Sequence, residues 1–296
     1  MLHTTIASDE DIRAATVPRK IDGGKWENGA VVLFAGSSDY HGAPVLAARA
    51  AYSAIAALRV GTGYAQLYVP KAIIGRVRSL SPNIIVREFG KKNIREGEIS
   101  IAKLGIDKAE AVAIGMGIGR GKATMMKAAS IIDYAVASKK KVVVDADAIY
   151  SVGNVRRFDK NVVLTPHLGE FGKIYGKELK ARSLEDRIQA AVRMSKKIGC
   201  CILLKGHETV VTDGEEIKVI RSESSALATM GTGDVLSGII SGYMACGADS
   251  FRAAVAGAYV HSRIGDRLYK KKGTHIIAVD VAEAIPSFLK RFDRKG

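Results

Sequence analysis

The stretch ATMGTGDVLSGIISGYMACG, residues 228–247, places two closely spaced glycines and an aspartate ahead of an apolar run. Gly231 and Gly233 allow backbone angles that other residues avoid, so successive N–H groups there can turn inward and form a nest for an anion. The apolar run predicts a helix, whose positive N-terminal end points at the same place. The stretch therefore predicts an anion-binding site at the start of a helix.

Asp234 follows the two glycines and admits two interpretations. The simpler one is a helix N-cap, a position that aspartate favours. The functional one is a general base, which takes the proton of an alcohol while the nest holds a phosphoryl group in transfer. General-base help contributes about 10²–10⁴ in rate. This stretch alone leaves both interpretations open.

The rest of the chain alternates short apolar runs with longer alanine-rich segments, which predicts an α/β fold with a mainly parallel central sheet and helices on both faces. The expected strands lie at 30–36, 64–70, within 111–119, and at 141–148, 161–167 and 201–206, followed by a hairpin turned at 213–216. The expected helices lie at 42–61, 122–138, 184–198, after 233, and at 250–269 and 280–291. Ligands of such sheets bind at the carboxyl ends of the strands, where the glycine loops should converge.

The familiar nucleotide fingerprints are missing from the sequence. It holds no G-x-x-x-x-G-K-[ST], and the loop GMGIGR at 115–120 reads G-x-G-x-G rather than G-x-G-x-x-G. This loop is either a plain glycine turn or a place where a ligand approaches bare backbone. Asp145 and Asp147 are expected to lie on one face of the strand at 141–148, because alternate side chains of a strand point the same way. Their roles stay open between loop hydrogen bonding and outer support of a metal ion.

Length and composition favour one large domain. The chain has 296 residues, of which 47% are hydrophobic, and we expect a single domain over 1–296 with residues 1–22 as an N-terminal extension. No apolar run reaches about 18 residues, the length that predicts a membrane span, and no secretory signal is recognisable. Three cysteines lack metal-type spacing, and the neighbours Cys200 and Cys201 should point to opposite faces of a strand. We expect a cytoplasmic protein without a membrane partner.

The net charge of +15 raises the question of nucleic acid. The basic residues are spread along the chain, and the densest runs, at 138–142, 269–273 and 290–296, are not interleaved with the aromatic residues of a stacking platform. We therefore expect no nucleic-acid partner. A nucleotide-binding regulatory or nucleic-acid-binding protein is the alternative from another class, and the charge alone favours it.

Seven motifs in one order resemble the NAD(P)H-hydrate dehydratases of the ribokinase-like superfamily, over about residues 23–290. They are VLFAGSSDYHGAPVLAARAA, RVGTGYAQLYVP, AIGMGIGR, VVVDADAIY, VVLTPHLGEFGKIYG, LLKGHETVVTDG and GTGDVLSGIISGYMACG. The family usually has proline where Met116 and Leu168 stand here. A vitamin-precursor kinase of the same superfamily, for hydroxyethylthiazole or a pyrimidine, is the alternative enzyme.

The resemblance implies a ribokinase-like fold and a lyase reaction. ADP or ATP phosphorylates the ring hydroxyl of the S-epimer of hydrated NADH or NADPH (NADHX or NADPHX), and loss of phosphate restores the cofactor. Mg²⁺ assists, and ADP is the favoured donor. The resemblance also implies a homo-oligomer and an epimerase of the same pathway on a separate chain.

The resemblance assigns roles to residues of this sequence. Asp234 is the catalytic base, and the anion hole consists of Gly231, Thr232 and Gly233. The nucleotide-binding residues are Lys205, Gly206, His207, Glu208, Thr209 and Gly233. The substrate-binding residues are Ala43, Gly117, Gly119, His167 and Asp234. Glu170 organises the metal, and Tyr40 is either a stacking partner of a base or a core residue.

Overall fold

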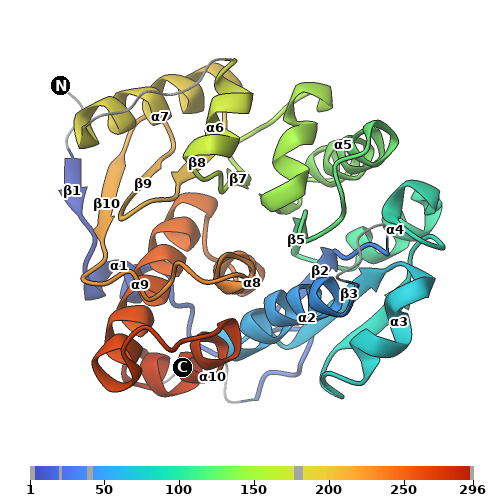
Figure 1. Cartoon of the computed structure of the whole chain (residues 1–296), viewed down its shortest axis with the longest axis horizontal. Coiled ribbons are helices and arrows are strands. Elements are labelled where there is room, and N and C mark those ends of the chain that lie inside the picture. The colour runs from blue at the N-terminus through green and yellow to red at the C-terminus, as the bar shows by residue number, and fades with distance from the viewer. Residues whose placement is uncertain (1–3, 20–21, 39–42, 177–182, 294–296) are drawn as a thin grey trace.

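The computed structural model describes residues 4–19, 22–38, 43–176 and 183–293, with the side chains of 43–51 and 175 excepted. Over these residues the chain forms one ten-stranded sheet in the order β1-β10-β9-β8-β7-β6-β5-β2-β3-β4 (Figure 1). The seven strands from β8 to β4 run parallel, β9 is antiparallel to both of its neighbours, and β1 is parallel to β10. The predicted mainly parallel sheet is confirmed.

The strands are short, as is usual where helices connect them. They are β1 (Thr4–Ile6), β2 (Ala30–Phe34), β3 (Tyr64–Val69), β4 (Ile85–Glu88), β5 (Ala111–Ile114), β6 (Lys141–Val144), β7 (Val162–Leu164), β8 (Cys201–Leu204), β9 (Glu208–Thr212) and β10 (Ile217–Arg221). β9 and β10 form the hairpin expected around 213–216. β1 belongs to the segment expected as an N-terminal extension, and it adds to the sheet at the β10 edge.

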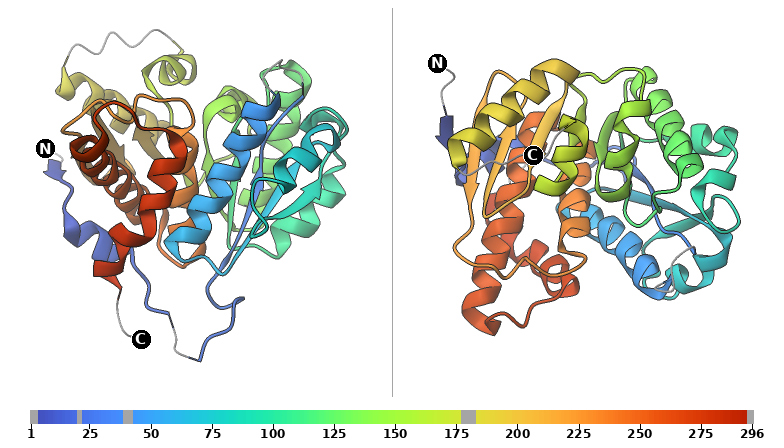
Figure 2. Two further views of the ribbon diagram at one scale, coloured as in Figure 1. Left: turned by 60° about the horizontal axis from the view of Figure 1, so that its bottom comes forward. Right: turned by 45° about the horizontal axis from the view of Figure 1, so that its top comes forward.

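Helices cover both faces of the sheet (Figure 2). They are α1 (Asp9–Ala15), α2 (Ala43–Val60), α3 (Lys71–Arg78), α4 (Ile99–Asp107), α5 (Lys122–Ala137), α6 (Leu168–Tyr175), α7 (Leu184–Ile198), α8 (Thr232–Ala245), α9 (Ser250–Lys272) and α10 (Ala278–Leu289), with 3₁₀ turns η1 (Ile94–Glu96), η2 (Ala146–Asn154) and η3 (Lys290–Phe292). In the part of the chain described, no helix is both long and apolar enough to cross a bilayer.

All strands except β1 and β4 contribute alternate side chains to two separate cores. Val31 and Leu33 of β2 belong to the core that includes side chains of α1, α2, α3, α8, α9 and α10, whereas Val32 and Phe34 belong to the core with α4, α5, α6 and α7. This is why the strands read as continuous apolar runs rather than as alternating ones. Cys200 and Cys201 lie in different cores, as predicted.

The prediction for the strand at 141–148 is wrong at its C-terminal end. The run 141–148 was expected to stay extended, but β6 stops at Val144, and Ala146, the first residue of η2, takes a left-handed conformation with φ of 48°. Asp145 and Asp147 therefore do not share the face of a strand. The left-handed residue turns the chain and sends the two carboxylates to different partners.

Helices α2 and α8 cross closely because α8 has glycines at the contact. A Cβ placed on Gly238 would lie 2.2 Å from the Ser53 carbonyl oxygen, and one on Gly242 would lie 3.0 Å from that of Ala57. The Ser53 hydroxyl also donates to the Asp234 carbonyl at 2.7 Å. The first turn of α8 is thus held against α2.

We expect Gly238→Ala to lower the free energy of unfolding by about 1–3 kcal/mol, because the added methyl group overpacks the crossing. Gly75→Ala is the control, because a Cβ at Gly75 meets nothing within 4 Å; this change should stabilise α3 by up to about 1 kcal/mol. Urea unfolding of both variants measures the two effects. Equal stabilities would show that the crossing has room to spare.

Candidate active site

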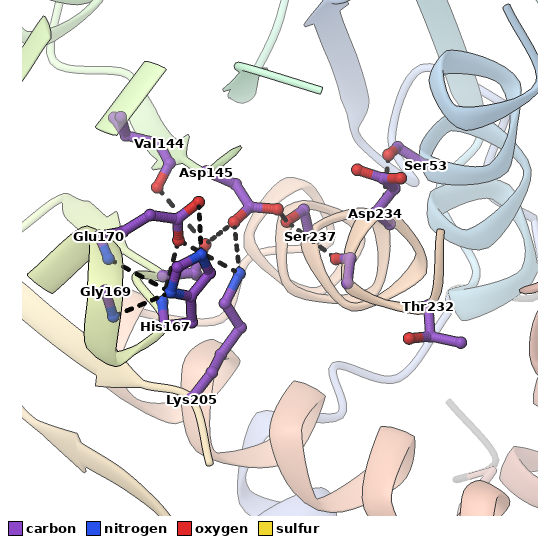
Figure 3. Close-up of polar contacts among 12 residues, drawn as sticks. Ser53, Val144, Asp145, His167, Gly169, Glu170, Lys205, Thr232, Asp234 and Ser237 are labelled. Carbon is purple, nitrogen blue, oxygen red and sulfur yellow. Dashed lines mark hydrogen bonds and ion pairs between the residues drawn. The ribbon is translucent and has the colours of Figure 1, made fainter. Parts of the chain in front are cut away.

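Polar side chains gather where β6, β7 and β8 end, opposite the start of α8 (Figure 3). Asp145 follows β6, Thr165 and His167 follow β7, and Lys205 follows β8. A bridge between His167 and Lys205 extends the parallel ladder just past the named strands, and the Lys205 N–H donates to the Pro166 carbonyl at 2.9 Å. The carboxyl edge of the sheet therefore carries the residues that the sequence analysis singled out.

Asp145 links three elements at this edge. Its carboxylate is 1% exposed and accepts hydrogen bonds from Lys205 Nζ at 2.9 Å, Thr165 Oγ1 at 2.7 Å and Ser237 Oγ at 2.6 Å. Burial opposes ionisation, but the Lys205 ammonium and the two hydroxyl donors hold the pKa of Asp145 below its ordinary value. Both carboxylate oxygens are engaged, so Asp145 orients Lys205 and ties β8 to α8.

Lys205 carries the positive charge of the site. Burial disfavours its charged form, but Asp145 and Glu170 raise the pKa of Lys205 above its usual value, and Asp234 adds to this effect. The Nζ atom lies 4.0 Å from Glu170 Oε2. Lys205 is therefore a fixed ammonium at the carboxyl edge.

Glu170 and His167 form a capping box at the start of α6. His167 Nδ1 accepts from the N–H groups of Gly169 at 3.0 Å and Glu170 at 3.2 Å, and Glu170 Oε2 accepts from the His167 N–H at 2.9 Å. The His167 side chain is 57% exposed, with Nε2 3.4 Å from Glu170 Oε1. Because Nδ1 is an acceptor, the proton of the ring lies on Nε2, which faces the Glu170 carboxylate.

The carboxylates at this edge could contribute to a Mg²⁺ site that water and phosphate oxygens complete. Within the described ranges no group of three or more His, Cys, Asp or Glu side chains could hold a metal ion. Mg²⁺ is commonly bound through one or two carboxylates, water and substrate phosphates. Asp145 is saturated by its donors, and burial raises the pKa of Glu170 above its usual value although Lys205 opposes this. Glu170 is thus the carboxylate that a nearby cation would stabilise.

The start of α8 is built around Gly231, which is left-handed with φ of 92°. The Thr232 N–H donates to the Thr229 carbonyl at 3.3 Å, and the Asp234 N–H donates to the Gly231 carbonyl at 3.1 Å. A Cβ on Gly233 would lie 3.9 Å from Lys205 Nζ. Of the predicted anion-hole residues, Gly233 is therefore the one placed against the lysine.

His261 of α9 contacts the first turn of α8. Its Nε2 lies 2.8 Å from the Thr232 carbonyl oxygen, and burial lowers the pKa of His261 to about 4. The ring is neutral near pH 7, so Nε2 carries the proton that it donates. Nothing in the sequence marks this contact, which forms when α9 packs against α8.

Asp234 is the third residue of α8 and is 1% exposed. Its side chain lies on the flank of α8 that faces Ser53 and α2, whereas Ser237, Asp145 and Lys205 meet on the other flank (Figure 3). The predicted base thus lies at the carboxyl edge of the sheet, close to the ammonium but separated from it by the first turn of the helix.

Asp147 organises the glycine loop after β5. Its carboxylate accepts the Gly119 N–H at 3.0 Å and Arg120 Nε at 2.7 Å. Gly117 and Gly119 have φ of 70° and 86°, which glycine adopts without strain. The Asp147 contacts support the loop-hydrogen-bonding interpretation that the sequence left open, and Met116 of this loop is buried.

The turn between β8 and β9 is shaped by Arg187 of α7. Arg187 Nη2 donates to the Glu208 carbonyl at 2.5 Å, and a Cβ on Gly206 would lie 2.2 Å from the same nitrogen. The other predicted nucleotide residues of this turn differ in their contacts: Glu208 pairs with Arg221 at 3.1 Å, Thr209 donates to the Gly206 carbonyl at 3.1 Å, and His207 is exposed. No sequence signal singled out Arg187, because its contact with this turn depends on how α7 packs beside β8 and β9.

Two predicted residues lie at the edge of what the structure describes. Ala43 is the first residue of α2, and its side chain is outside the described set. Tyr40 lies outside the described residues, so its role stays open. Ala43 stands at the helix start that faces the same edge of the sheet.

A family model and several known proteins are similar to this chain over most of its length. The family model described as NAD(P)H-hydrate dehydratase matches residues 31–287. The ADP-dependent (S)-NAD(P)H-hydrate dehydratase of Cenarchaeum symbiosum is 33% identical over 97% of both chains. The bifunctional NAD(P)H-hydrate repair enzyme of Archaeoglobus fulgidus is 35% identical over 88% of this chain and 51% of that protein.

Solved structures agree on the architecture. A ribokinase-like superfamily protein from Enterococcus faecalis has a TM-score of 0.80 at 24% identity, covering 98% of this chain and 96% of that one. The ADP/ATP-dependent NAD(P)H-hydrate dehydratase from Bacillus subtilis, co-crystallised with ATP and Mg²⁺, has a TM-score of 0.79 at 24% identity, covering 98% and 99%. These likenesses show the fold, which is ribokinase-like as predicted.

Removing the ammonium tests the electrostatics of the site. In Lys205→Met, Asp145 and Glu170 stay buried without a counter-charge, and we expect a loss of about 3–5 kcal/mol of unfolding free energy at about pH 8. The pKa of each carboxyl in the folded variant then lies above its pKa in the unfolded chain, which is about 4. Ionisation of these carboxyls therefore destabilises the fold increasingly as the pH rises above about 4. Lowering the pH to about 5 should restore part of the stability of the variant.

Lys218→Met is the control, because Lys218 pairs with Asp11 at 2.8 Å and is 22% exposed, against 23% for Lys205. This pair lies at the β1–β10 edge, and its removal should cost no more than about 1 kcal/mol. Unfolding curves across the pH range make the comparison. A Lys205→Met deficit that does not shrink in acid would contradict the assigned ion pairing.

Proposed function

The chain belongs to the NAD(P)H-hydrate dehydratase family, and from this premise we propose how its residues act. The enzyme is an ADP- (or ATP-) dependent dehydratase of the S-epimer of hydrated NADH or NADPH, and it restores the reduced cofactor. The observation that carries the residue assignment is the first turn of α8. It places Gly233 against Lys205 on one flank and Asp234 on the other.

The nucleotide phosphates bind at Lys205 and at the start of α8. The ammonium and the N-terminal helix dipole both favour negative charge there. A side chain at Gly233 would fill the space beside Lys205 Nζ, which glycine leaves to the phosphoryl group. Gly206 and His207 directly follow Lys205 and are exposed, so they contact the bound nucleotide.

Asp234 takes the proton of the ring hydroxyl as the hydroxyl oxygen attacks the terminal phosphorus of the nucleotide. The bond from that phosphorus to the bridging oxygen breaks, and AMP leaves when ADP is the donor. The ring nitrogen then pushes out phosphate, with loss of a ring proton, and the carbon–carbon double bond is restored. Hydroxide is a poor leaving group and phosphate a good one, which is why a kinase-like site serves a dehydration.

Substrate contacts come from the neighbouring loops. His167 presents Nε2, and Gly117 and Gly119 expose a loop without side chains that Asp147 holds in place. Ala43 begins the helix beside Asp234. Glu170 would hold Mg²⁺ through water, and the ion would neutralise charge on the phosphates.

The name of the Cenarchaeum symbiosum relative favours ADP as donor. The family match favours the dehydratase over a vitamin-precursor kinase. The experiment that tests both points is recovery of reduced-nicotinamide absorbance from hydrated NADH with ADP and ATP in parallel, with and without Mg²⁺, beside consumption of a thiazole alcohol. The bifunctional relatives support an epimerase in the same pathway. A cytoplasmic homo-oligomer remains our expectation for the assembly.

We expect Asp234→Asn to lower kcat by at least about 10² while leaving ADP affinity nearly unchanged, because the amide cannot accept the proton. Asp280→Asn is the matched control, since Asp280 is also the third residue of its helix and accepts from the Ile277 N–H at 2.9 Å. It should keep kcat and lose only some stability. Near-normal turnover of Asp234→Asn would end the assignment of the base.

Gly233→Val should weaken ADP binding by about tenfold or more, equivalent to about 1.4 kcal/mol, because its side chain enters the phosphate space beside Lys205. Gly153→Val serves as the comparison, because a Cβ there meets nothing within 4 Å. Calorimetric titration with ADP measures both. Equal affinities would remove Gly233 from the nucleotide site.

A further inference from the structure

A cavity of about 600 Å³ lies at the end of the molecule away from the active site. It is enclosed by residues 16–19 ahead of β2 and by the closing turns of α2, α8 and α10. Ligand pockets of proteins have volumes of about 300–1,000 Å³, so the cavity is large enough for a small organic molecule. The active-site residues described above do not line it.

The lining of the cavity combines apolar side chains with cationic ones. Leu58, Leu289 and Phe292 line the wall, and Arg19 and Arg59 are among the cationic residues around it. Lys290 adds a third cation, and the lining also includes the carboxylates Glu27 and Asp293. Such a lining matches a ligand with an apolar body and a charged head.

The two guanidinium groups are held by main-chain carbonyls rather than by carboxylates. Arg59 Nη1 donates to the Ala282 carbonyl at 2.8 Å, and Arg19 Nη2 donates to the Gly61 carbonyl. Among the described residues neither group makes an ion pair, whereas Glu27 accepts the Gly24 N–H at 2.7 Å. The two guanidinium groups are therefore oriented by main-chain carbonyls, without a carboxylate partner among the described residues.

A buried polar atom marks the same wall. Tyr243 lines the cavity and is 3% exposed, and its hydroxyl makes no hydrogen bond of normal length to a described residue. Thr16 lies beside it, and the Thr16 hydroxyl, which donates to the Ile12 carbonyl at 2.7 Å, keeps lone pairs that can accept from Tyr243. The Tyr243 hydroxyl therefore places a polar group next to Thr16 in the otherwise apolar part of the lining.

We propose that this cavity is a second binding site, for a small organic anion that carries a phosphate or carboxylate head on an apolar body. The planar guanidinium groups of Arg19 and Arg59 pair with such a head, for which their donors are well matched. The apolar body lies against Leu58, Leu289 and Phe292. The site is separate from the catalytic one, and its occupancy does not depend on the bound nucleotide.

Calorimetric titration of the full chain, kept saturated with ADP to fill the active site, tests the proposal. Octyl phosphate and octanoate are the anionic probes, and octanol and octylamine are the neutral and cationic comparisons. We expect one site per chain that binds at least one of the anions, at least about tenfold tighter than the other two compounds. Which anion binds more tightly distinguishes a phosphate from a carboxylate ligand.

Arg59→Met and Arg19→Met, each of which keeps an unbranched apolar stem, should weaken the anion about tenfold. Arg76→Met, on the exposed surface of α3, should not. Variants of both Arg19 and Arg59 are used so that a folding defect in one, checked by its melting curve, leaves the other to decide. Failure of both anions to bind at millimolar concentration, equal binding of octylamine, or equal affinity in the Arg76 variant and in the Arg19 and Arg59 variants would each overturn the proposal.

Discussion

The ion pair between Asp145 and Lys205 is the constraint on which the site depends. The buried Asp145 carboxylate accepts hydrogen bonds from the Lys205 ammonium and from two hydroxyl groups. These bonds fix the ends of β6, β7 and β8 relative to α8. Burying these charges costs free energy, which the ion pair and the complete set of hydrogen bonds offset. A lysine oriented in this way is a positive charge in a set position, which is what a phosphate ligand requires.

The first turn of helix α8 positions both Gly233, beside the lysine, and Asp234, the proposed base. Its glycines let it approach α2, its first turn places Gly233 toward the lysine, and Asp234 faces the other way. The glycines at 231 and 233, which the sequence singled out, therefore act for different reasons. Gly231 supplies a left-handed turn before the helix, and Gly233 leaves space beside Lys205.

The sequence predicted the sheet, most of its helices and the edge where the site lies, because strands buried on both faces and glycine loops after strands leave clear patterns. It did not predict β1, β4, α1, α3, α4 or α6, whose runs are short, and it extended β6 past the left-handed Ala146. It named Lys205 and Asp234 through motifs. Ser237, His261 and Arg187 escaped it, because their roles come from contacts between different elements, and no motif in the sequence marks these contacts.

The single antiparallel strand β9 has a consequence for ligand binding. Because β9 reverses at the carboxyl edge, Lys205 stands at the mouth of a tight hairpin with a β-ladder on each side, instead of at the start of a loop that leads to a helix. The lysine is ordered when the protein folds. An arriving nucleotide therefore meets a charge already immobilised, and it is spared the entropy loss of freezing a long flexible side chain.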